Sequence, residues 1–143
     1  MLYQLGPLTL DTFPFSADGV EREIEADFAR HDVMNRRRPH EFEGAGDETL
    51  DISGSILPFH TGGLSHLDLA QSLCEDGREL FVMRGDGRVL GWYVLKKVGE
   101  RHRDIGPGGV GFVVGHRLGL ERAEDPGEAA GAGLVATLLS LFG

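Results

Sequence analysis

The stretch RRPHEFEGAGDETLDISGSILPFHTGGLSHLDLAQSLC, from Arg37 to Cys74, decides the expected fold because strand, turn and helix signals follow one another in it. Apolar and polar residues alternate from Thr49 to Leu57, which is the period of a half-buried strand. Gly54 in the middle of this strand indicates a bulge or a close approach of another backbone, and Pro58 ends it. Before it, the run 44–47 (Gly-Ala-Gly-Asp) predicts a turn that follows a short strand at 41–43.

One helix is expected after the Thr61-Gly62-Gly63 turn, from about His66 to Glu75, with Ser65 as its N-cap and Gly77 as its stop. Four apolar residues share one face of this helix at helical spacing: Leu67, Ala70, Leu73 and Cys74.

The rest of the chain predicts mainly strands. Glycine accounts for 22 of 143 residues, and without a repeating period this abundance favours many tight turns. Short apolar segments at 2–5 and 8–10 are separated by Gly-Pro, and residues 20–33 alternate as a strand, although their composition would also suit a helix.

Further along, the chain predicts a hairpin and a long last strand. Segments 79–83 and 88–98 flank the hairpin turn Gly85-Asp86-Gly87, a loop is expected over 101–109, and a last strand over 110–120.

Charge and composition narrow the classes of function. A net charge of −9 disfavours a broad nucleic-acid surface, and the local exception, Arg36-Arg37-Arg38, favours an acidic protein partner over nucleic acid. The single cysteine excludes an internal disulfide bond. We expect no signal peptide, because residues 1–13 lack a basic flank and a long apolar core. We expect no membrane span, because no apolar run reaches about 18 residues.

No constellation of residues predicts catalysis. His60 and His66 straddle a turn without a third ligand at a recognisable spacing, so a metal site is not expected. Cys74 lies on the apolar face of the expected helix, where a small buried side chain is the usual role. The glycine-rich turns at 85–87 and 106–109 are followed by strands rather than by a helix N-terminus, which argues against phosphate loops. We therefore expect no catalytic, cofactor-binding or metal-binding residues.

An ordered set of motifs resembles the GpU family of tail proteins from contractile-tailed bacteriophages. The resemblance spans about Met1 to Glu124 and leaves out the apolar tail at 126–143. Its motifs are the opening Met-Leu-x-x-Leu-Gly, Arg38-Pro39, Phe42, Gly44, Gly46, the strand at 49–56 with Ser53-Gly54, Pro58, Thr61-Gly62-Gly63, the leucine-bearing helix, Gly77, the turn at 85–87, Gly91, and Leu118, Leu120, Glu121 and Arg122.

The resemblance implies a structural protein of the virion tail, assembled in the host cytoplasm, and not an enzyme. The implied fold is α+β and mostly β, a tail-tube-like β-sandwich or barrel with one flanking helix. The implied function is a tube-initiator ring next to the baseplate hub, built from copies of the chain, which we expect to number six. Further implied partners are the hub protein, the tail tube protein and the end of the tape measure protein, with DNA only passing through the lumen. Alternatives are a tail terminator or completion protein and an assembly chaperone for the tape measure; a small cell-wall hydrolase is the least favoured.

We expect a tail-tube-like domain over residues 1–124 and a linker plus an apolar, helical C-terminal extension over 125–143. The extension is too short to cross a bilayer, so we expect it to dock on a neighbouring subunit. The residues expected to contact other subunits are Arg36, Arg37, Arg38, Gly85, Asp86, Gly87, Arg101, Arg103, Leu134, Leu138, Leu139 and Phe142.

Overall fold

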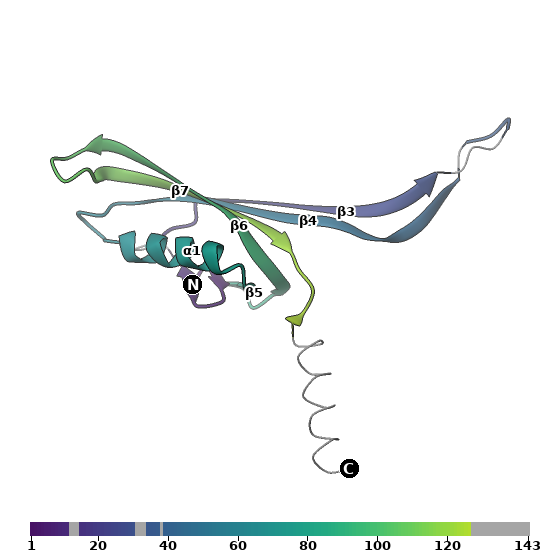
Figure 1. The fold of residues 1–143 in the computed structure, drawn as a ribbon, viewed down its shortest axis with the longest axis horizontal. Coiled ribbons are helices and arrows are strands. Elements are labelled where there is room, and N and C mark those ends of the chain that lie inside the picture. The colour runs from purple at the N-terminus through teal and green to yellow at the C-terminus, as the bar shows by residue number, and fades with distance from the viewer. Residues whose placement is uncertain (12–14, 31–33, 38, 127–143) are drawn as a thin grey trace, which may run out of the picture.

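The computed structural model describes residues 1–11, 15–30, 34–37 and 39–126. These residues form one antiparallel sheet of seven strands, in the order β2-β1-β5-β6-β7-β4-β3, and one helix (Figure 1). The elements along the chain are β1 (Tyr3–Leu5), β2 (Leu8–Leu10), β3 (Gly19–Arg30), β4 (His40–Ile56), α1 (Leu64–Asp76), β5 (Glu79–Arg84), β6 (Val89–Ile105) and β7 (Gly111–Arg122).

The expectation of a closed sandwich or barrel is corrected by this strand order. Within the described residues the sheet is open, with β2 at one edge and β3 at the other. The strands β1, β2 and β5 and the helix α1 lie on the same side of the long strands, and the β3–β4 and β6–β7 hairpins extend from this body in opposite directions (Figure 1). The mostly β class with a single helix is confirmed. The helical extension lies outside the described residues.

One hydrophobic core lies between α1 and the curved sheet. It takes side chains from the short N-terminal strands, from the inner halves of β4 and β7 and from the buried face of α1. Its fully buried members include Leu8, Leu50, Leu67, Tyr93 and Leu118. Burial of these apolar side chains, at about 25 cal/mol per Å², is the main force that holds the sheet to the helix.

The N-terminal pair and the β5–β6 hairpin agree with the sequence. β1 and β2 pair antiparallel across a turn at Gly6, whose φ of 57° lies in the left-handed region that glycine adopts without strain. β5 and β6 pair on either side of the turn at 85–87. The strand expected over 20–33 is also found, as β3, as far as Arg30.

The turn expected at 44–47 is wrong, because β4 runs without a break from His40 to Ile56. Its glycines serve irregularities in the pairing with β3, where the register shifts between Ile24 and Ala26 and between Asp27 and Phe28. Gly44 has a φ of 129°, a conformation that side chains other than glycine rarely adopt.

Two further boundaries differ from the sequence-based expectation. β6 continues through the segment expected to be a loop and ends at Ile105. The helix starts at Leu64, and its N-cap is Gly63 rather than Ser65, without a side-chain capping bond. Gly77 stops the helix as expected, with a φ of 64° and its N–H donating to the Leu73 carbonyl.

Candidate functional site

The outer part of the β3–β4 hairpin is a two-stranded arm with no further strand beside it. β4 pairs with β7 only from Thr49 to Ile56, so its segment from His40 to Glu48 pairs with β3 alone. Two-stranded ribbons are only marginally stable in water by themselves. An arm of this kind therefore gains stability when another surface covers it.

Large apolar side chains are exposed on this arm. Ile24, Phe28 and Phe42 have exposed fractions of 64%, 52% and 63%. The rings of Phe28 and Phe42 pack edge to face at 5.5 Å, and His40 lies against Phe28 at 6.2 Å. Apolar groups gathered on an extended arm are typical of a surface that binds another protein.

The β6–β7 hairpin carries a second open edge. β5 pairs with β6 only as far as Val94, so the stretch of β6 from Lys97 to Ile105 pairs with β7 alone among the described strands. Ile105 and Phe112 near the end of this hairpin are exposed to 64% and 51%. The ring of Phe59 lies 5.0 Å from that of Phe112, so this end also presents an apolar surface.

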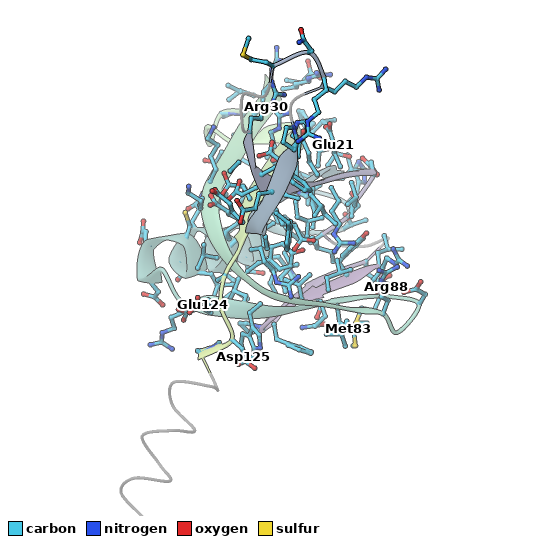
Figure 2. The ribbon with its side chains drawn as sticks, turned by 90° about the vertical axis from the view of Figure 1, so that its right-hand side faces the viewer. Glu21, Arg30, Met83, Arg88, Glu124 and Asp125 are labelled. Carbon is cyan, nitrogen blue, oxygen red and sulfur yellow. The ribbon has the colours of Figure 1, made fainter. Side chains whose placement is uncertain are left out.

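The expected contact residues lie on three separate parts of the molecule. Arg36 and Arg37 are exposed at the tip of the β3–β4 arm, and Arg101 and Arg103 are exposed on the open edge of β6. The turn at 85–87 lies elsewhere: Figure 2 shows Met83 and Arg88, which flank it, well away from Glu21 and Arg30 on β3. The remaining expected residues lie outside the described part of the chain: Arg38, Leu134, Leu138, Leu139 and Phe142.

The turn between β5 and β6 is held by Asp86. Its carboxylate accepts hydrogen bonds from Arg84 Nη2 at 2.7 Å, from Arg84 Nε at 3.0 Å and from the Arg88 backbone N–H at 3.1 Å. These bonds, that from Arg84 foremost, lower the pKa of Asp86 to about 2. Further along the same hairpin, the rings of Phe81 and Trp92 pack edge to face with their centroids 5.4 Å apart. The turn is therefore a preformed surface feature.

A buried ion network, which the sequence analysis missed, fixes the base of the β3–β4 arm. Glu48 on β4 accepts a hydrogen bond from Arg22 on β3 at 2.5 Å and one from Arg122 on β7 at 2.8 Å. Burial opposes ionisation of Glu48, but the two guanidinium groups outweigh it and lower the pKa of this carboxyl. The Arg122 guanidinium also lies 5.7 Å above the Tyr93 ring. The network ties three neighbouring strands together where the arm leaves the body.

The chemistry-bearing residue types do not gather into a reactive site in the described part of the chain. No group of three or more histidine, cysteine, aspartate or glutamate side chains there is placed to hold a metal ion. His116 is buried, stacks on Phe15 at 4.1 Å and contacts the Ser16 carbonyl through Nε2 at 2.6 Å. Burial lowers the pKa of His116. No helix among residues 1–126, as far as they are described, is long and apolar enough to cross a membrane.

Comparison with protein families matches residues 7–125 to the model of Phage P2 GpU. The chain belongs to the GpU family of phage tail proteins. This match confirms the family that the ordered motifs resemble, and it covers every strand and helix of the described residues except β1. Membership of this family supports a structural role in a phage tail.

A solved structure is also similar to this GpU-family chain. It is described as the cryo-EM structure of the anti-feeding prophage (AFP) baseplate, 6-fold symmetrised. The two chains are 14% identical, the TM-score is 0.40, and the similarity covers 87% of each chain. Comparison with curated proteins gives no match.

Proposed function

We propose that this GpU-family protein forms a ring at the start of the tail tube, next to the baseplate hub, and that the ring holds six copies. The observation that carries this proposal is the pair of open strand edges on hairpins that extend in opposite directions from one body. Open edges are usually shortened, blocked or covered in a protein that stays alone. Here they are long, and a ring of copies would cover both at once.

The ring would contact the hub protein on one side and the first tube subunits on the other. The preformed turn at 85–87, on the hairpin that also carries Phe81 and Trp92, offers a rigid surface that is separate from the two open edges. The exposed arginines at the tip of the β3–β4 arm suit an acidic neighbour, for which the end of the tape measure protein is one candidate.

The overall charge of −9 fits a channel through which DNA passes without being held, because like charges repel the phosphates. An assembled ring whose lumen is lined mainly by basic side chains would contradict this part of the proposal.

Locating the protein in purified particles tests the proposed position. Particles that carry a peptide tag on this chain are labelled with gold and imaged by electron microscopy. We expect the label at the baseplate end of the tube. A label at the collar would instead identify a tail terminator or completion protein. Absence of the chain from purified tails, measured by mass spectrometry, would overturn the proposal in favour of an assembly chaperone.

A further inference from the structure

We propose that neighbouring copies join through the outer edge of β3 and the open edge of β6, matched by opposite charge. This inference rests on the proposed ring and names the surfaces that form it. β3 is the last strand of the sheet, and β6 pairs with β7 alone from Lys97 to Ile105. Within one chain β7 and β4 separate these two strands, so only another copy can bring β3 against β6.

The directions of the strands suit this joint. Each successive pair from β6 through β7 and β4 to β3 is antiparallel, so β6 and β3 of one chain run in opposite directions. A second copy in the same orientation therefore presents its β6 antiparallel to the first copy's β3. Main-chain hydrogen bonds would then continue the sheet from copy to copy. The interface is head-to-tail, the kind that closes into a ring.

The charged side chains of the two edges lie on the same face of the sheet. Leu50, Leu118 and Leu120 are buried, so the residues that alternate with them face away from the core. On β3, Glu21 and Glu23 lie opposite Asp51 and Thr49, and both therefore face outward. The corresponding outward residues of β6 lie opposite Gly119, Gly115 and Val113: they are Lys97, Arg101 and Arg103.

We call Glu21 and Glu23 the acidic stripe, and Lys97, Arg101 and Arg103 the basic stripe. All five side chains are exposed, and none forms an ion pair within the described part of the chain. If the sheet continues between copies, both stripes lie on its outward face beside the joint. Complementary charge selects this pairing over acidic-to-acidic or basic-to-basic contact, which like-charge repulsion disfavours.

The test uses two variants of the full chain with reversed charge. The first, Glu21→Arg/Glu23→Arg, makes both stripes basic; the second, Arg101→Glu/Arg103→Glu, makes the basic stripe largely acidic. Neither should disturb the fold, because the new arginine at 21 lies opposite Asp51 and the new glutamates lie opposite Gly115 and Val113. Self-association is measured by sedimentation velocity, with circular dichroism as the check on folding.

We expect the wild-type chain to associate, and to do so more weakly as salt rises from about 0.05 M to about 0.5 M. Each variant alone should associate at least about tenfold more weakly. An equimolar mixture should associate again, because each variant then offers the charge that the other needs. Matched controls are Glu75→Arg/Asp76→Arg, at the end of α1, and Arg78→Glu/Arg88→Glu, all exposed residues away from both edges. These should associate like the wild type.

Three results would overturn the pairing: a wild-type chain that stays monomeric at low salt, variants that associate like the wild type, or a mixture that fails to associate. If the mixture does not associate, and each variant is also absent from assembled tails, the two edges bind another tail protein instead of another copy. The proposed function is read separately, from the presence of the wild-type chain in purified particles. Particles that contain all variants at wild-type levels would contradict the charge pairing but not the proposed ring.

Discussion

Gly54 lies where a distant segment of the chain presses against the middle of β4. A Cβ atom at this position would lie 2.2 Å from the Ser16 carbonyl oxygen and 2.8 Å from Nε2 of His116. Ser16 cannot move aside easily, because its hydroxyl donates to the Ser55 carbonyl at 2.6 Å and accepts from the Ser55 N–H at 3.1 Å. The glycine therefore permits a close approach, one of the two explanations that its place within a strand suggested from the sequence alone.

Gly54→Ala should destabilise the protein by about 3 kcal/mol, since the methyl group meets backbone rather than a flexible side chain. Chemical unfolding monitored by fluorescence measures the difference. The matched control is Gly108→Ala, where an added Cβ meets nothing within 4 Å. Equal stability of the two variants would contradict the tight packing around Gly54.

Glu48 shows what a sequence pattern cannot identify at this scale. It belongs to an alternating strand whose other acidic residues face water, and nothing in its neighbours distinguishes it. Only the pairing of β4 with β3 on one side and β7 on the other brings Arg22 and Arg122 to the same carboxylate. Among the acidic residues of β4, Glu48 is the one that is buried.

Glu48→Gln should cost about 2–3 kcal/mol at pH 7, because it leaves two partly buried guanidinium groups without their counter-charge. The pKa of Glu48 is lowered in the folded state, so its stabilising effect is present above its ordinary pKa and is lost as pH falls through the lowered value. The gap in free energy of unfolding between wild type and variant should therefore narrow as pH falls from 7 to below the ordinary pKa of a glutamate. Urea unfolding at pH 7 and at an acidic pH measures this difference, with Glu79→Gln, at an exposed position, as the control. A gap that persists unchanged at low pH would show that the charge of Glu48 is not its cause.

At the scale of elements, local periodicity predicted the short strands, the hairpin turn and the position of the helix. It failed where glycines lie inside a continuous strand and only make its pairing irregular. The run at 44–47 has the composition of a turn, yet the strand continues through it without a break and has its glycines at irregularities in the pairing with β3. Whether residues 44–47 form a turn or continue the strand depends on whether β3 is long enough to pair with the whole of β4. The length of β3 cannot be read from the sequence of β4. The open edges have the same origin, because they depend on where neighbouring strands stop.

The β3–β4 arm should be the least stable part of the free protein and should become stable on assembly. Its amide protons from Ile24 to Arg30 should exchange with solvent faster than those of β7 in the monomer, and should become protected in the assembled state. Phe28→Ser/Phe42→Ser should speed exchange in the arm and weaken assembly, with little change in global stability, because both rings are half exposed or more. Hydrogen exchange read by mass spectrometry measures these effects. The control Met34→Ser, at the exposed tip, should leave hydrogen exchange in the β3 and β4 strands of the arm unchanged. An arm as protected as the core in the monomer would contradict its need for a partner.

At the scale of the whole molecule, the family assignment was predictable and the shape was not. An ordered set of turn and strand motifs is enough to indicate the family, since order along a chain is visible in its sequence. Whether seven strands close on themselves is decided by contacts between distant segments, and here β2 and β3 stay apart as the two edges of the sheet. Two hairpins leave the body in opposite directions, and each has a strand edge without a hydrogen-bonding partner in the described chain. This arrangement fits a subunit whose open edges pair with neighbouring subunits.

The apolar segment at the C-terminal end provides the last prediction at this scale. Residues 129–142 read AAGAGLVATLLSLF, and we expect them to dock on a neighbouring subunit. Removal of residues 126–143 should leave the fold of the remaining chain intact, because the core is built from residues before 121. It should lower the yield of intact tails by about tenfold or more, since burial of one leucine side chain contributes about 1.5–3 kcal/mol. Tails are counted by electron microscopy after complementation with the shortened chain. Leu138→Ser/Leu139→Ser should reproduce the loss, and Thr137→Ser should not. A wild-type yield from the shortened chain would remove the docking role of this segment and leave the family assignment untouched.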